Sequence, residues 1–210
     1  MASAIQSPRG FFDMSELPSL FDRNRYALLP SLLTDPDLSL IYRYLCTITG
    51  AGLMKSGDRL VPHAACRYGD PMTDSVLLKL QPAIEQATGL SLHPTYSYVR
   101  LYKKGDELQK HTDRESCEIS VTLCLGMDPA APWPIHIEGP GGCFGIELSA
   151  GDALLYRGIE LAHWRTPYVG EQLGQLFLHY VDQYGQYADW KFDRRPSLSH
   201  VPGRADRMPA

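Results

Sequence analysis

Residues 117–125 read Cys-Glu-Ile-Ser-Val-Thr-Leu-Cys-Leu, and this stretch decides the fold class of the chain. Apolar side chains at every second position alternate with polar or small ones, which is typical of a β-strand with two different faces. We expect the apolar row to pack outward against helices. The other row, Ser120, Thr122 and Cys124, then points inward, and a polar inward face indicates a cavity that holds a ligand.

Further strands are expected on both sides of this stretch. Residues 96–102 are aromatic and β-branched and end at a turn over residues 103–106. Shorter strands are expected at residues 135–137, 143–148, 153–157, 161–165 and 174–181. Turns rich in glycine and proline separate them, and the chain has 18 Gly and 16 Pro in 210 residues.

Two helices are expected before the strands. The first has Asp35 as a plausible N-cap, Pro36 at its first position and apolar residues at helical spacing up to Gly50. The second starts at Thr73 or Asp74 and runs to about residue 88, with Pro82 bending or splitting it. The first 30 residues show no clear period.

Helices followed by about seven or eight short strands predict an α+β fold, mainly β. In it, an antiparallel sandwich or barrel carries the N-terminal helices on one sheet. We expect a single domain over residues 1–195, with a helical part at about 1–92 and a β core at about 93–182. Residues 196–210 are expected to form a mobile tail. The content of 44% hydrophobic and 21% charged residues excludes a wholly disordered chain.

Composition also limits the partners and the compartment. Twenty Lys and Arg against 24 Asp and Glu give a net charge of −4, which favours neither nucleic acid nor an anionic membrane as partner. No apolar run approaches the roughly 18 residues of a membrane span, and Pro8 and Arg9 interrupt any signal peptide. Five cysteines without a C-x-x-C pair indicate free thiols and a cytoplasmic protein.

A candidate metal site consists of His111-Thr112-Asp113 and, about fifty residues later, His163. An H-x-D triplet alone is weak, since about 0.5 are expected by chance in such a chain. The spacing, however, would bring opposite sheets of a double-stranded barrel onto one metal. Two imidazoles and one carboxylate are the set that non-haem Fe(II) oxygenases prefer, and they leave positions for a bidentate cosubstrate and for O₂.

The sequence around these residues resembles the 2-oxoglutarate/Fe(II)-dependent dioxygenase superfamily, in particular its prolyl-4-hydroxylase-like group. The likeness covers about residues 94–182. Its front half is carried by Arg100-Leu101-Tyr102-Lys103-Lys104-Gly105, His111-Thr112-Asp113 and Ile119-Ser120-Val121-Thr122-Leu123, and its back half by Gly151-Asp152-Ala153-Leu154-Leu155-Tyr156, His163, Pro167 and Gly170.

The resemblance implies a double-stranded β-helix, or jelly roll, with Fe(II) as metal and 2-oxoglutarate and O₂ as cosubstrates. His111, Asp113 and His163 are then the metal ligands and the catalytic residues. The implied reaction decarboxylates 2-oxoglutarate to succinate and hydroxylates an unactivated C–H bond. A carboxylate ligand at 113 favours hydroxylation over halogenation, because halogenases of the superfamily lack it.

The chain departs from the family in one respect. Family members bind the distal carboxylate of 2-oxoglutarate with an Arg or Lys nine or ten residues after the last His, where this chain has Gln172 and Leu173. If His163 points into the barrel, so does Arg165, which we expect to replace the missing cation. The alternative is an exposed rim residue. Tyr102, which matches a cosubstrate-facing tyrosine, and Thr122 are the other candidate cofactor-binding residues.

Arg100 shares the inward face of Tyr102 and is the candidate substrate-binding residue. A second cation in the cavity would favour a substrate carboxylate or phosphate. The alternative is an ion pair with Glu118 or another carboxylate across the sheet. On the last strand we expect Gln175, Phe177 and His179 to point inward, with His179 either a fourth metal neighbour or a hydrogen-bonded core residue.

These observations favour hydroxylation of a small, anionic molecule of amino-acid or natural-product type. Hydroxylation of a prolyl or other protein side chain is the alternative. Repair of alkylated nucleic acid is disfavoured by the acidic balance. A further alternative is a non-catalytic jelly-roll protein that binds a metal or ligand. The absence of the usual cosubstrate arginine supports this alternative. The oligomeric state is left open.

Overall fold

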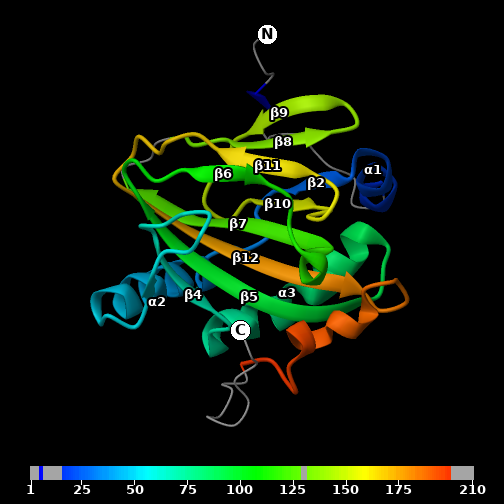
Figure 1. Ribbon diagram of the computed structural model, residues 1–210, viewed down its shortest axis with the longest axis horizontal. Coiled ribbons are helices and arrows are strands. Elements are labelled where there is room, and N and C mark those ends of the chain that lie inside the picture. Colours follow the sequence, from blue (N-terminus) through cyan, green and yellow to red (C-terminus); the bar gives the residue numbers. More distant parts are fainter. Residues whose placement is uncertain (1–4, 7–15, 129–131, 200–210) are drawn as a thin grey trace.

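The centre of the molecule is a pair of β-sheets that face each other, with helices packed on the outside of the larger one (Figure 1). The computed structural model describes residues 5–6, 16–128 and 132–199. The expected mainly-β α+β fold is confirmed.

The smaller sheet has five strands in the order β1-β9-β8-β11-β6, all antiparallel except β1 with β9. Its strands are β1 Ile5–Gln6, β6 Leu108–His111, β8 Ile135–Gly139, β9 Gly142–Ile146 and β11 Ala162–Arg165.

The larger sheet has seven antiparallel strands in the order β2-β10-β7-β12-β5-β4-β3. They are β2 Tyr26–Leu29, β3 Lys55–Ser56, β4 Ala65–Tyr68, β5 Leu92–Lys103, β7 Ile119–Asp128, β10 Ala153–Tyr156 and β12 Gln172–Asp182. The long strands β5, β12 and β7 form its centre, because each pairs along most of its length with the next.

Helices cover the outer face of the larger sheet. They are α1 Leu17–Asn24, α2 Asp37–Gly50 and α3 Pro71–Thr88, and the 3-10 helices are η1 Glu115–Cys117 and η2 Ala188–Arg194. No helix within the described ranges is long and apolar enough to span a membrane. All five cysteines are free thiols, as expected.

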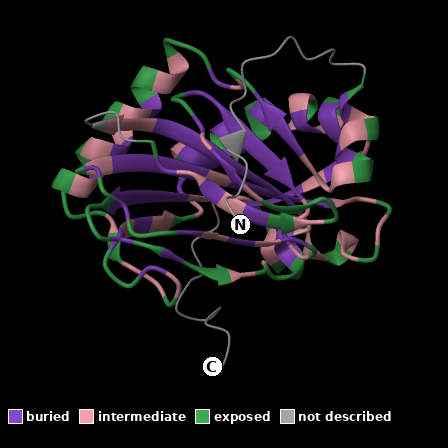
Figure 2. Cartoon of the chain, turned by 90° about the horizontal axis from the view of Figure 1, so that it is seen from above, coloured by how far each residue is buried: buried purple, intermediate pink, exposed green. Residues whose placement is uncertain are grey.

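The two faces of β7 divide as the alternation predicts. Ile119, Val121 and Leu123 are fully buried in the largest hydrophobic cluster, which also holds Leu45 of α2 and Leu77 of α3. Figure 2 shows this buried layer running through the central strands, while the helices expose their outer sides. The opposite face of β7 is therefore free to line the space between the sheets.

Several expectations about the N-terminal part need correction. The first helix starts at Asp37, so Asp35 is not its N-cap. The second starts at Pro71 and continues unbroken past Pro82. The region expected to be helical also supplies the short strands β1 to β4, which lack a long alternating pattern.

The C-terminal tail was expected to begin at residue 196. Within the described part of this segment, Ser199 contacts the fold: its amide and its hydroxyl donate to Asp74 at 2.8 and 2.7 Å. Arg195, just before this segment, also contacts the fold, because its Nη2 donates to the carbonyl of Thr95 at 3.1 Å. Residues 200–210 lie outside the described residues.

Asp70 is the true N-cap of α3. Its buried carboxylate accepts from the amide of Met72 at 2.9 Å and pairs with Arg67 Nε at 2.8 Å. The hydroxyl of Tyr44 also donates to it, at 2.8 Å to the nearer oxygen. One side chain thus begins α3 and ties it to α2 and β4.

We expect Asp70→Ala to lower the free energy of unfolding by about 1–2 kcal/mol, because it removes a helix cap. Urea denaturation measures this change. Asp22→Ala is the control, since Asp22 is 80% exposed in its pair with Arg25, and a change within about 0.5 kcal/mol is expected there. Equal effects of the two substitutions would contradict the assignment.

Candidate metal centre

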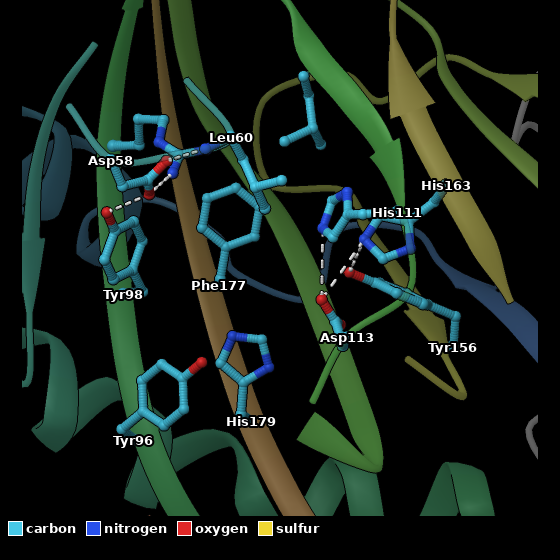
Figure 3. Close-up of a pocket in the computed structure, with 12 residues that line it drawn as sticks. Asp58, Leu60, Tyr96, Tyr98, His111, Asp113, Tyr156, His163, Phe177 and His179 are labelled. Atoms are coloured by element: carbon cyan, nitrogen blue, oxygen red, sulfur yellow. Dashed lines mark hydrogen bonds and ion pairs between the residues drawn. The ribbon is translucent and has the colours of Figure 1, made fainter. Parts of the chain in front are cut away.

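Two histidines face each other across adjacent strands of the smaller sheet. His163 on β11 is the direct partner of His111 at the end of β6, and their ring centroids are 4.3 Å apart. Asp113 follows β6, and its Oδ1 lies 3.5 Å from Nε2 of His111 and 3.7 Å from Nε2 of His163. The three ligand atoms lie within 4.8 Å of one another (Figure 3).

The expected group is therefore assembled, but not from opposite sheets. Both histidines belong to the smaller sheet. The error arose because β6, only four residues long, gave no recognisable strand pattern.

Backbone carbonyls orient both rings. Nδ1 of His111 lies 2.8 Å from the carbonyl of Gln109, and Nδ1 of His163 lies 3.0 Å from the carbonyl of Leu161. A carbonyl accepts only from a protonated nitrogen, so the hydrogen sits on Nδ1 in each neutral ring. Each Nε2 then carries a lone pair directed at the same point as Asp113, which is how metal-binding histidines are commonly held.

Asp113 is fixed by its backbone and by Ser120. Its amide donates to the carbonyl of Gly158 at 2.9 Å, and Ser120 Oγ donates to Oδ2 at 2.8 Å. Burial opposes ionisation, but hydrogen bonding with His111 and the nearby His163 hold the pKa of Asp113 well below its usual range. Burial lowers the pKa of His163. An ionised carboxylate beside neutral imidazole is the state that binds a metal.

Gly158 leaves the space that Asp113 occupies. A Cβ at this position would lie 2.3 Å from Oδ2 of Asp113, 2.5 Å from the carbonyl of Cys117 and 2.6 Å from Ser120 Oγ. No sequence pattern pointed to Gly158, because the close approach exists only in the folded chain.

A cavity of about 140 Å³ opens beside the three ligands, between the two sheets. It is lined by Asp58, Leu60, Tyr96, Tyr98, Arg100, Leu108, His111, Asp113, Tyr156, His163, Phe177 and His179. Figure 3 shows the ligand group on one side, Asp58 and Tyr98 on the other, and Phe177 between them. The structure therefore places Phe177 and His179 on the inward row of β12.

His179 is a hydrogen-bonded residue at the floor of this cavity. Its Nδ1 lies 3.0 Å from Ser120 Oγ, and its ring packs on Tyr96 at a centroid distance of 4.6 Å. Burial lowers its pKa to about 4. Its ring also lies within 4.8 Å of ligand atoms of Asp113 and Cys117, so it neighbours the metal group.

Arg165 points inward together with His163, as alternation along β11 predicts, and it is only 3% exposed. Its Nη1 donates to the carbonyl of Trp133, whose ring lies 4.7 Å from the guanidinium carbon. Burial lowers its pKa, and no carboxylate pairs with it among the described residues. A rim position is thus excluded.

Tyr102 and Thr122 also point between the sheets and are fully buried. The hydroxyl of Tyr102 accepts from Arg100 Nη1 at 3.0 Å, and Thr122 Oγ1 accepts from Gln175 Nε2 at 2.6 Å. The Oε1 atom of Gln175 has no hydrogen-bond partner among the described residues. Tyr102, Thr122 and Arg165 are not among the residues that line the cavity.

Arg100 lines the cavity and already has an anion. Its Nη2 pairs with Asp58, which comes from the loop between β3 and β4. Glu118, the carboxylate named in the sequence prediction, instead lies 3.9 Å from Arg157 and accepts from the amide of Asp182. Asp58 was missed because a lone aspartate in a polar loop gives no pattern.

The C-terminal helix η2 contacts the metal loop, the segment after β6 that carries Asp113 and Arg114. Arg114, which follows Asp113 directly, donates through both Nη atoms to the two oxygens of Asp193 at 2.7 Å each. The hydroxyl of Tyr68 donates to the same carboxylate. The backbone at Asp193 is left-handed, with φ of 57°, so these contacts hold a conformation that aspartate seldom adopts.

Proteins similar to this chain are found among solved structures. No family model and no curated protein sequence matches it. A prolyl-4-hydroxylase from Pseudomonas putida superposes with a TM-score of 0.65 at 18% identity, over 80% of this chain and 98% of that one. The epimerase SnoN in complex with Fe³⁺, alpha ketoglutarate and nogalamycin RO gives 0.70 at 13%, over 91% and 93%.

HygX from Streptomyces hygroscopicus, with nickel, 2-oxoglutarate and hygromycin B bound, superposes with a TM-score of 0.64 at 11% identity, over 80% of this chain and 87% of that one. At such identities the likeness shows the fold. The resemblance inferred from the sequence is thereby confirmed at the level of the fold.

We expect Gly158→Ala to weaken metal binding by about 10–100-fold, because the added methyl group displaces the Asp113 carboxylate and its support. A titration with Co(II), followed by visible absorption, measures the affinity. Gly50→Ala is the matched control, since a Cβ there meets nothing within 4 Å. A folded Gly158→Ala protein with unchanged affinity would show that Asp113 is not a ligand.

Proposed function

We propose that the chain is an Fe(II)- and 2-oxoglutarate-dependent oxygenase whose iron is held by His111, Asp113 and His163. The observation that carries the proposal is the convergence of two Nε2 lone pairs and an ionised carboxylate within 4.8 Å. The group fits Fe(II), which accepts two imidazoles and one carboxylate on one face and keeps further positions open. Structural neighbours that contain iron or nickel with the 2-oxo acid support it.

The two facing sheets are then the two halves of a double-stranded β-helix, and residues 1–195 form one domain. In support, strands from residues 26–68 and from residues 92–182 join in one sheet. Five free thiols fit a reducing compartment such as the cytoplasm.

Bound iron supplies the oxidation, in which 2-oxoglutarate, O₂ and a substrate C–H bond give succinate, CO₂ and an alcohol. The protein holds the reactants. His111 and His163 keep their protons on Nδ1, so that Nε2 remains available. Tyr156 also lines the cavity beside the ligands, and its hydroxyl lies 3.4 Å from Nε2 of His163.

Arg165 is the proposed anchor for the distal carboxylate of 2-oxoglutarate, with Tyr102 and Thr122 beside it. A buried guanidinium without an anion is costly, and a carboxylate ligand removes that cost. Arg100 is the weaker candidate for this role because it has a carboxylate partner in Asp58, whereas Arg165 has none among the described residues. Arg165 thus takes the place of the basic residue that family members carry where this chain has Gln172 and Leu173.

The substrate is a small anionic molecule bound through Arg100. The support is a cation buried in the wall of a cavity that also contains the metal group. Hydroxylation of a prolyl residue in a protein is the second candidate, favoured by the likeness to the Pseudomonas prolyl-4-hydroxylase. A buried arginine in the wall of the same cavity gives a prolyl side chain nothing to bind, so the first candidate is preferred.

Anaerobic addition of Fe(II) and 2-oxoglutarate should give the visible absorption band of an iron-bound 2-oxo acid. His111→Ala should abolish the band and the formation of succinate under air, because it removes a ligand. His93→Ala is the control, since His93 lies at the outer end of β5 and does not line the cavity. Neither a band nor succinate from the unaltered protein would favour a binding protein without catalysis.

Arg165→Gln should raise the KM for 2-oxoglutarate at least about tenfold, because a lost charge-assisted hydrogen bond costs on the order of 1.5–3 kcal/mol. The measurement is succinate formation at varied 2-oxoglutarate. Lys104→Gln is the surface control, its side chain being 66% exposed. An unchanged KM in the Arg165 variant would place the anchor elsewhere.

A further inference from the structure

Arg100 lies among three aromatic rings, and one of its guanidinium nitrogens has no hydrogen-bond partner among the described residues. Its guanidinium carbon lies 5.2 Å from the ring centre of Tyr98, 5.3 Å from that of Tyr102 and 5.8 Å from that of Phe177. Nη1 donates to Tyr102, and Nη2 pairs with Asp58. Nε is buried and has no hydrogen-bond partner among the described residues.

Asp58 joins this guanidinium to the loop over residues 57–64. Its Oδ1 accepts from the amides of Leu60 and Val61 at 3.0 and 2.9 Å. Its Oδ2 accepts from the hydroxyl of Tyr98 at 2.7 Å and from Arg100. One carboxylate therefore holds the loop in shape and pins it to β5, with Leu60 in the cavity wall.

Asp58 contacts only one of the two nitrogens of Arg100 that could together bind a carboxylate. Nε and the adjacent Nη form a fork that receives both oxygens of a carboxylate, and Asp58 fills one prong. Asp58 is also the more accessible partner, with 34% of its side chain exposed against 4% for Arg100. It can leave toward water, whereas Arg100 stays buried, where the loss of its anion is costly.

We propose that Asp58 is a displaceable internal counter-ion. The carboxylate of the substrate takes its place on Arg100, and the release of Asp58 frees the 57–64 loop that closes the cavity. This inference rests on the proposed function for the statement that the bound acid is the substrate. The exchange of one carboxylate for another on Arg100 does not depend on it. Arg100 stays paired before and after, so the exchange selects for a carboxylate and against its neutral analogue.

The cavity wall around Arg100 also indicates what the part of the substrate other than its carboxylate is like. Phe177 lies between Asp58 and the metal group (Figure 3), and Leu60 and Tyr98 also line the cavity, so much of its wall is apolar or aromatic. The substrate class is therefore a carboxylic acid with an apolar or aromatic body. Its carboxylate lies on Arg100 and its reacting carbon points to His111 and His163.

The test uses the metal-free full-length chain and two probes, 3-phenylpropionate and its neutral amide. Calorimetry gives their affinities for the unaltered protein, Asp58→Asn and Arg100→Gln. Asp58→Asn keeps an oxygen for the amides of Leu60 and Val61 while removing the competing charge. It should bind the acid at least about tenfold more tightly, with no change for the amide probe. Arg100→Gln should lose the preference for the acid.

Hydrogen exchange provides a second readout. In the unaltered protein, the acid should speed exchange of the Leu60 and Val61 amides as Asp58 leaves them, and the neutral amide should not. Glu171→Gln is the matched control, because it removes the same charge from a surface pair that is 66% exposed.

Three results would overturn the proposal. They are acid affinity in Asp58→Asn that is equal to or weaker than in the unaltered protein, no acid binding by either protein, and unchanged loop exchange on saturation with acid. All arms are read without metal. A failed iron and 2-oxoglutarate assay is therefore distinguishable from a failure of the counter-ion exchange.

Discussion

The pairing of β6 with β11 is the constraint on which the rest of the site depends. It sets His111 opposite His163, and for each histidine the backbone carbonyl two residues earlier in the chain orients the ring. Neither histidine needs a side-chain partner to fix its tautomer. The metal group is therefore a property of strand register, and a shift by one residue would turn one imidazole to the far face of the sheet.

The larger sheet separates two tasks between its faces. One face carries the hydrophobic cluster against the helices, and this cluster holds the long strands in place. The other face carries Ser120, Thr122, Arg100 and Tyr102 into the space between the sheets. Polar groups there are nearly all paired with one another, so the interior is held by hydrogen bonds before any ligand enters.

The sequence predicted what depends on local pattern. Alternation placed the two faces of β7, the inward direction of Arg165 and the inward row of β12. It missed β6 because four residues with a polar middle carry no period, and it missed Asp58 and Gly158 because their roles arise from contacts between distant segments. For Arg100 the sequence offered an ion pair with Glu118 or another carboxylate, and for the same reason it did not identify Asp58 as the partner. Strand direction is local, whereas the partner of a charge depends on the whole fold.

The bond between Arg114 and Asp193 gives the C-terminal segment a place in the site. Asp193 lies 80 residues beyond Asp113, yet it fixes the next residue in the metal loop. A fragment that contained every strand but stopped at residue 185 would keep both sheets and lose this brace. The loop that carries Asp113 is thus supported by a segment that lies beyond the last strand of the β fold.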